Sequence, residues 1–318
     1  MRLFENANYD FIGKRRLTYM VVLGVALFAL LPGLVFQLSS RGWFNWGVDF
    51  TGGTLVQVSF TQPMTVAELR GVVEPIAPGA AISDFGDKNE FLIRAQNAAG
   101  AATTGIADQI DQTLRARYGA NYTKGRTEAV GPKVGSELQT RATIAVLLSF
   151  AATLIYLAFR LEWTFGVAAI AATISDILFT LGVLATFRHL EFSLTTVAAL
   201  LTIIGYSLND KIVVFDRVRE NLKVRRREEF APLINRSVNE TLPRTVMTGG
   251  SVIAVLAVLF LVGGIAIRDF ALIMFLGIVV GTFSSMFLAP VVLIEINKRW
   301  GDRAKVKNSK PARAGAAD

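Results

Sequence analysis

Six long apolar runs constrain the fold of this chain more than any other feature. A helix needs roughly 20 apolar residues to cross a hydrocarbon core of about 30 Å, and runs of about that length recur along the sequence. They cover residues 17–38, 140–159, 164–187, 192–215, 244–264 and 270–294. We therefore predict a polytopic α-helical membrane protein with six transmembrane helices.

Lys and Arg residues gather beside particular ends of these runs, and they predict the orientation of the chain. Three basic residues, 14–16, precede the first run, which is long for a signal peptide and has no small-residue cleavage site after it, so we expect an uncleaved anchor. By the positive-inside rule, residues 1–16, 216–243 and 295–318 are expected in the cytoplasm. The net charge of +8 then reflects topology and contact with anionic membrane lipid, and nucleic-acid binding is not expected.

The longest segment between two runs, residues 39–139, is expected outside the cytoplasm and is long enough for one small domain. Its apolar patterns and its capping box, formed by Thr65 and Glu68, predict the order β-α-β-β-α-β. The predicted strands cover 54–60, 81–85, 90–95 and 122–130, with a hairpin turn at 86–89, and the predicted helices cover 65–76 and 104–118. This order predicts an external ferredoxin-like α+β domain.

The residue types that carry most enzyme chemistry are scarce. The chain has one histidine, His189, and no cysteine, so neither a zinc site nor a Cys-His nucleophile can be assembled. No P-loop or dinucleotide-binding fingerprint is present. We expect no enzyme activity and no cofactor, and we interpret His189, in a short outside loop, as functionally inert.

Ionisable residues inside the apolar runs are the strongest functional signal. Asp176 interrupts the third run, Asp210 and Lys211 interrupt the fourth, and Arg244 begins the fifth. A charge at mid-membrane costs about 2.5–3.5 kcal/mol on insertion scales, so each one needs a partner, water or a function. We predict that Asp210 and Arg244 share a leaflet and can pair, which would let a carboxylate couple proton passage to helix movement.

A structural interpretation of the same charges stays open. In this interpretation Asp210 and Lys211 neutralise each other or extend to the cytoplasmic interface, while Asp176 hydrogen-bonds a neighbouring helix. Adjacent helical positions point about 100° apart, which weakens a pair between Asp210 and Lys211.

Several motifs resemble the SecF branch of the SecD/SecF family of protein-export membrane proteins, within the resistance-nodulation-division (RND) superfamily. The resemblance covers nearly the whole chain. It rests on FNWGVDFTGGT at 44–54, VGPKVG at 130–135, FRLEW at 159–163, IGYSLND at 204–210 and VFDRVREN at 214–221. Residues 206–210 are the stretch that separates this branch from SecD.

The resemblance implies a function and its partners. Such a chain pairs with SecD to form twelve helices in the bacterial inner membrane, joins the SecYEG channel and YajC, and uses the proton-motive force to drive late translocation of unfolded preproteins. Protons are the coupling ion. The implied proton path comprises Asp210, Arg244 and Asp176, and Tyr206, Ser207 and Asn209 form the supporting motif.

Two positions depart from the family pattern. Ser175 stands where relatives often carry His before the third-span acid, and Lys211 stands where they carry a small polar residue. The first departure removes a possible proton-relay group, and the second places a cation beside Asp210.

The motif before the first strand has a structural interpretation. Gly52 and Gly53 permit a tight passage from membrane to strand, and we interpret Asp49, Gly52 and Gly53 as a structural hinge more readily than as a substrate-contact site.

Two alternative functions remain. One is a passive scaffold or assembly subunit of a membrane complex, and the other is half of an RND-type exporter of small molecules or lipids. A lone six-helix unit would turn its charged faces towards lipid, so we predict that Asp210 and Arg244 face a partner unit.

Overall fold

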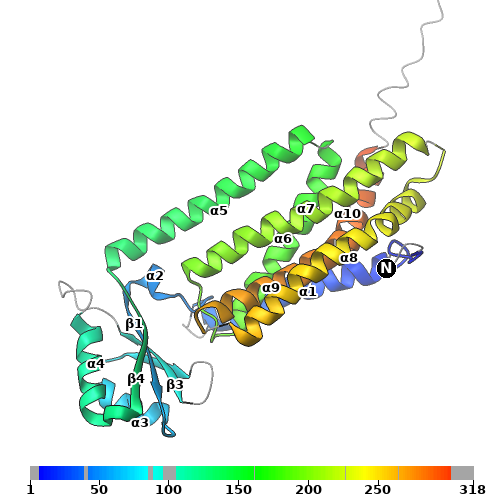
Figure 1. Cartoon of the computed structure of the whole chain (residues 1–318). Coiled ribbons are helices and arrows are strands. Elements are labelled where there is room, and N and C mark those ends of the chain that lie inside the picture. The colour runs from blue at the N-terminus through cyan, green and yellow to red at the C-terminus, as the bar shows by residue number, and fades with distance from the viewer. Residues whose placement is uncertain are drawn as a thin grey trace, which may run out of the picture.

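The computed structural model describes residues 7–38, 42–84, 89–95, 105–160, 162–225, 227–263 and 265–301. Most of the predicted hairpin turn at 86–89, and the basic tail beyond residue 301, lie outside the described residues. A small domain with a β-sheet stands at one end of a bundle of long helices, and the described N-terminal residues lie at the other end (Figure 1).

The small domain, here called the sheet domain, has the predicted order of strands and helices. Its elements are β1 (Gly53–Phe60), α3 (Val66–Val73), β2 (Ala81–Asp84), β3 (Glu90–Ala95), α4 (Gly105–Tyr118), a short 3₁₀ turn η1 (Gly119–Asn121) and β4 (Tyr122–Val130). The sheet order is β2-β3-β1-β4 with every pair antiparallel, which is the ferredoxin-like arrangement. The capping box is present, with Thr65 Oγ1 accepting from Glu68 N at 3.3 Å.

One face of this sheet is buried under the two helices. Strand alternation turns Val56, Val58 and Ile93 to that face, where they pack with Leu69 of α3 and Ile110 of α4. All five side chains are fully buried, so the sheet domain has a hydrophobic core of its own.

The long helices confirm the prediction of a six-span membrane protein. They are α1 (Arg15–Leu38), α5 (Pro132–Arg160), α6 (Trp163–Thr186), α7 (Leu194–Val224), α8 (Phe230–Val262) and α9 (Ile265–Met286), followed by α10 (Leu288–Ile296) and one turn of π-helix, η2 (Asn297–Gly301). The predicted run at 270–294 is therefore not one continuous helix, because α9 and α10 meet at Phe287.

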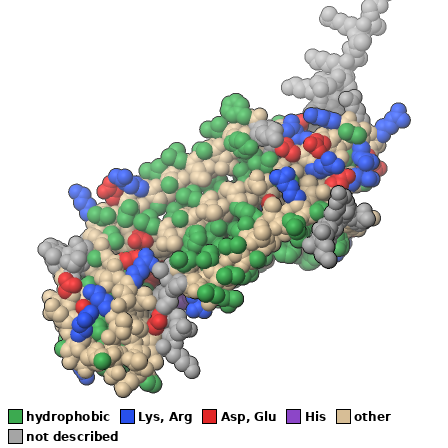
Figure 2. Space-filling view, in the orientation of Figure 1, with side chains coloured by type: hydrophobic (Ala, Val, Ile, Leu, Met, Phe, Trp, Pro, Cys, Tyr) green, Lys and Arg blue, Asp and Glu red, His purple; other side chains and the backbone are tan. Residues whose placement is uncertain are grey.

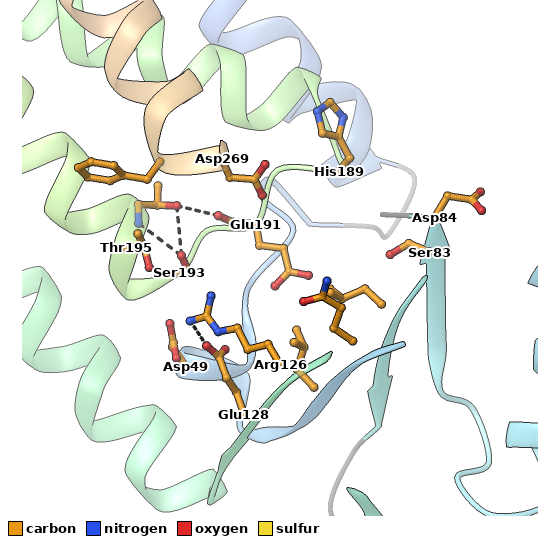
Figure 3. Close-up of a pocket in the computed structure, with 15 residues that line it drawn as sticks. Asp49, Ser83, Asp84, Arg126, Glu128, His189, Glu191, Ser193, Thr195 and Asp269 are labelled. Carbon is orange, nitrogen blue, oxygen red and sulfur yellow. Dashed lines mark hydrogen bonds and ion pairs between the residues drawn. The ribbon is translucent and has the colours of Figure 1, made fainter. Parts of the chain in front are cut away.

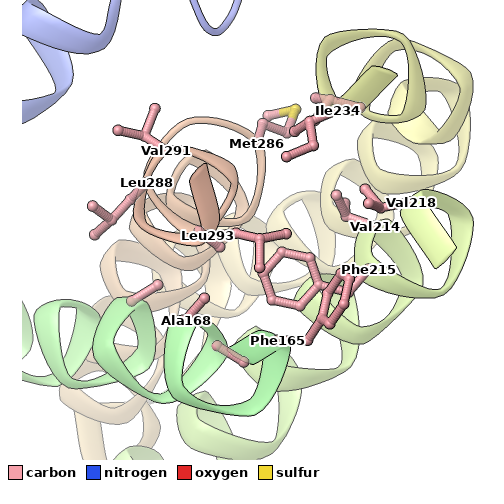
Figure 4. Packing of buried hydrophobic residues seen from close by; sticks show 14 of the residues in the cluster. Phe165, Ala168, Val214, Phe215, Val218, Ile234, Met286, Leu288, Val291 and Leu293 are labelled. Atoms are coloured by element: carbon pink, nitrogen blue, oxygen red, sulfur yellow. The ribbon is translucent and has the colours of Figure 1, made fainter. Parts of the chain in front are cut away.

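The segment 216–243, the basic segment expected in the cytoplasm, is mostly helix, because α7 and α8 extend beyond their apolar runs. The extensions pack together: Phe215 and Val218 of α7 lie in one buried cluster with Ile234 of α8 and Leu293 of α10 (Figure 4). Phe165 of α6 contacts Phe215, with ring centroids 5.5 Å apart. This packing stabilises the helical extensions, although their polar residues give the segment a low mean hydropathy.

The six spans divide into inner and outer helices. In α6, α7 and α9, 50%, 56% and 50% of the most apolar window is buried within the chain, against 11%, 6% and 17% in α1, α5 and α8. In Figure 2, apolar side chains cover the middle of the visible helical surface, while charged side chains gather towards its two ends. The outer helices therefore present apolar surface to lipid or to partner helices.

Candidate functional site

The centre of the inner helices holds a buried ion pair. Lys211 Nζ of α7 lies 2.7 Å from Asp176 Oδ2 of α6, and both side chains are 0% exposed. Ser207 Oγ donates to the same carboxylate oxygen at 2.5 Å, and Ser284 Oγ of α9 donates to it at 2.9 Å. Three helices thus contribute polar groups to one point in the membrane interior.

Lys211 pairs with Asp176 and not with Asp210, the partner that the structural interpretation offered. Ser207 and Lys211 lie one helical turn apart and face α6, where the ammonium group meets Asp176. Asp210 points about 100° away from Lys211 around the same helix. The structural interpretation gave Asp176 a hydrogen bond to a neighbouring helix, and Ser284 of α9 provides one. It did not include the ion pair between Asp176 and Lys211.

Asp210 is buried without a matching partner. Its side chain is 3% exposed, and its Oδ2 atom has no hydrogen-bond partner among the described residues. Arg244 is exposed on α8, and the described residues contain no ion pair between it and Asp210. The predicted contact is therefore absent in this conformation.

The supporting motif divides between two sides of α7. Ser207 belongs to the Asp176 centre, Tyr206 is half-buried, and Asn209 is exposed. Ser175, the first departure, lines a cavity of about 280 Å³ between α1, α6 and α9, together with Asp176 and Ser284.

The prediction that Asp210 and Arg244 face a partner unit is wrong for Asp210, which is buried within this chain, and stays a prediction for Arg244. Asp176, Lys211 and Asp210 are enclosed by this chain's own helices, because α6, α7 and α9 pack their polar positions towards one another. Arg244 alone of the predicted proton-path residues lies on the surface of the chain.

The motif before β1 forms a junction between the sheet domain and the membrane helices. Asp49 lies in a short helix, α2 (Val48–Thr51), and its Oδ2 accepts from the backbone N of Leu194 at the start of α7, at 2.8 Å. Gly52 and Gly53 then turn the chain into β1 with φ values of 70° and 121°. The predicted hinge residues therefore form a tight turn and a helix cap, and the cap joins this motif directly to the helix that carries Asp210.

Arg94 was missed by sequence reasoning, because it reads as an ordinary strand residue of β3. Its guanidinium donates to Asn45 Oδ1 at 3.1 Å and forms an ion pair with Glu191 in the loop between α6 and α7. Burial lowers the pKa of Arg94 from its usual value. This residue links the sheet domain to the membrane helices a second time.

A cleft of about 100 Å³ lies at the same junction (Figure 3). Asp49, Arg126, Glu128 and Glu191 line it from both sides. His189 lies at its edge and is exposed, as its loop position predicted.

Comparison with known proteins supplies the family. The model of the C-terminal region of the protein export membrane proteins SecD and SecF matches residues 109–299, and the SecD/SecF GG motif matches residues 43–64. The chain belongs to the SecD/SecF family. The GG-motif match includes the Asp49 cap and both glycines of the turn.

Full-length relatives place the chain in the SecF branch of the SecD/SecF family. Protein translocase subunit SecF of Gemmatimonas aurantiaca is 43% identical over 325 aligned residues, covering 100% of this chain and 96% of the relative. The corresponding subunit of Desulfurispirillum indicum is 41% identical, covering 89% and 90%. The crystal structure of SecDF from Thermus thermophilus, described as a translocon-associated membrane protein, matches with a TM-score of 0.81 and 36% identity. This chain covers 40% of that SecDF chain, with 94% of its own residues aligned.

Proposed function

We propose that this chain is the SecF-type subunit of a protein-export complex and that it uses the proton-motive force to drive late preprotein translocation. The observation that carries the proposal is Asp210, a buried carboxylate with an unpartnered oxygen in a membrane-spanning helix. A buried acid without a permanent cation can take up and release a proton as its surroundings change. Family membership supplies the export pathway.

Arg244 is proposed as the mobile partner of this acid. It is exposed on α8, which packs against α7, the helix that carries Asp210. Movement of α8 against α7 would bring the guanidinium closer and favour the ionised carboxylate. Asp176 is held by Lys211 in the conformation described here, so we assign it a supporting position in the path.

The proposed complex includes a SecD-type partner, the SecYEG channel and YajC, with an unfolded preprotein as substrate. The sparsely buried α1, α5 and α8 offer surface for partner helices, and the matched SecDF chain is longer than this one. We place the chain in the inner membrane of a bacterium with both termini in the cytoplasm, which follows the positions of its Lys and Arg residues.

Asp210→Asn tests the proposal, because the amide keeps the shape of the side chain but cannot ionise. We expect late translocation across energised vesicles to fall at least about tenfold, a loss of the size typical for removal of a proton-transfer group. Glu220→Gln, an exposed acid further along α7, is the matched control and should retain the wild-type rate.

Both variants must be compared at equal membrane abundance and with the SecD-type partner still bound. A wild-type translocation rate for Asp210→Asn under those conditions would contradict the motor proposal. It would instead favour the passive scaffold, whose acids are structural.

A further inference from the structure

The surroundings of Lys211 differ from those of an ordinary salt bridge. Its ammonium nitrogen contacts Asp176 Oδ2 at 2.7 Å, the hydroxyl of Ser207, and the Ser207 carbonyl oxygen at 3.4 Å. The hydroxyl of Ser284 approaches the same carboxylate oxygen and contacts the Gly281 carbonyl at 3.1 Å. Carboxylate, hydroxyl and carbonyl oxygens are the ligands that hard cations take in proteins.

One oxygen of the centre still has no partner. Asp176 Oδ1 is buried and accepts no hydrogen bond from any described residue. Asp176 also lies in the wall of the cavity of about 280 Å³ between α1, α6 and α9. Its carboxylate is 0% exposed, so a cation would reach it only in place of the Lys211 ammonium group, and Oδ1 is an unused ligand for such a cation.

We propose that the Lys211 ammonium group occupies a monovalent-cation site formed by Asp176, Ser207 and Ser284, and that this tethered charge makes the centre independent of Na⁺. The nitrogen sits where a bound ion would neutralise the Asp176 carboxylate. Lys211 thereby acts as a residue that determines ion specificity, since a site filled by the protein's own cation excludes a soluble one.

Removal of Lys211 should expose this property. In Lys211→Ser the carboxylate of Asp176 stays buried and loses its positive partner, which is strongly unfavourable unless a proton or a cation replaces it. The serine side chain leaves room for an ion and adds one more hydroxyl oxygen. Na⁺ binding to the folded state should therefore stabilise the variant but not the wild type.

The test measures thermal unfolding of the full-length purified chain in NaCl, KCl and choline chloride at equal ionic strength. Na⁺ at ten times its dissociation constant raises the ratio of folded to unfolded protein about elevenfold. We expect the unfolding midpoint of Lys211→Ser to rise by about 2–4 °C in NaCl relative to choline chloride. The wild type should show equal midpoints in both salts.

The double variant Asp176→Asn with Lys211→Ser is the matched control, because it removes both charges and should lose the response to Na⁺. A folded Lys211→Ser protein whose midpoint is the same in all three salts would overturn the proposal. A midpoint that depends on pH and not on Na⁺ would overturn it as well, because a proton would then have replaced the ammonium group.

Failure of the single variant to accumulate is also informative. If the double variant accumulates and Lys211→Ser does so only when Na⁺ is present throughout preparation, the proposal is supported. If Na⁺ does not rescue the single variant, the proposal is wrong. The role of this site in ion coupling rests on the proposed function, but the binding measurement does not, so failure of the Asp210→Asn experiment would leave its result unchanged.

Discussion

At the scale of single residues, Arg94 carries the side-chain link between the sheet domain and the membrane helices. Its contacts reach Asn45 before α2 and Glu191 after α6, so one side chain joins three segments. The exposed fractions of the Arg94 and Glu191 side chains are 20% and 16%, which reduces screening of the pair by water. An ion pair in this setting contributes more than one on the open surface.

Arg94→Ala should loosen this junction. The substitution removes two hydrogen-bonded contacts and leaves Glu191 partly buried without its cation, at a cost of about 1–3 kcal/mol. We expect faster hydrogen exchange in residues 188–193, measured by mass spectrometry. Arg126→Ala is the control, because Arg126 pairs with Glu128 in its own strand, and an equal effect of the two substitutions would show that Arg94 is not a link.

At the scale of elements, the passage from α2 into β1 depends on an unusual backbone. Gly52 has φ 70° and ψ 168°, a combination that is essentially restricted to glycine. Gly52 both ends α2 and sets the direction of β1. Its backbone conformation therefore helps to set the position of the sheet domain relative to α7.

Gly52→Ala should therefore destabilise the protein by about 1–3 kcal/mol, the usual cost of such backbone strain. Gly71→Ala is the matched control: it lies inside α3, where an added Cβ meets nothing within 4 Å, and alanine there should stabilise the helix by about 0.5–1 kcal/mol. Thermal unfolding of the two variants side by side measures the difference. Equal midpoints would contradict the role assigned to the turn.

Sequence patterns predicted these elements where one local signal was enough. Apolar length identified six spans, and alternation together with the Thr65 capping box identified the sheet domain. The lengths of the helical extensions into 216–243 could not be predicted, because their stability comes from packing between α7 and α8 rather than from hydropathy. The one-residue interruption at Phe287 left no mark on the hydropathy of the sixth run.

Site residues were predicted, but their pairing was not. The positions of Asp176, Asp210 and Lys211 inside apolar runs identified them as buried charges, because burying a charge in the membrane is costly. The choice of Asp176 as the partner of Lys211 depends on how α6 and α7 rotate against each other, and residues 35 positions apart carry no local signal of that rotation. Arg94 and Glu191, 97 positions apart, escaped for the same reason.

At the scale of the whole molecule, the sheet domain and the α7–α8 extensions lie at opposite ends of the helices (Figure 1). They must therefore reach opposite sides of the membrane, whichever side each one faces. The distribution of Lys and Arg predicts that the extensions are cytoplasmic.

Single cysteines can test this orientation, because the natural chain has none. Thr127→Cys places an exposed thiol on β4, and Lys223→Cys places one at the end of α7. A membrane-impermeant maleimide should label Cys at 127 in intact spheroplasts and Cys at 223 only after permeabilisation. The reverse pattern would show that the orientation is wrong.

The sparse burial of α5 has a consequence for the way this sequence can change over evolutionary time. Only 6% of its most apolar window is buried within the chain. Along most of the length of α5, the side chains therefore contact lipid or partner helices rather than other helices of this chain. A side chain that contacts lipid must be hydrophobic but need not have a particular shape. Leu, Ile, Val and Phe are therefore nearly interchangeable at such positions. Positions in α5 that nevertheless resist exchange among relatives would mark where another protein, and not lipid, touches this helix.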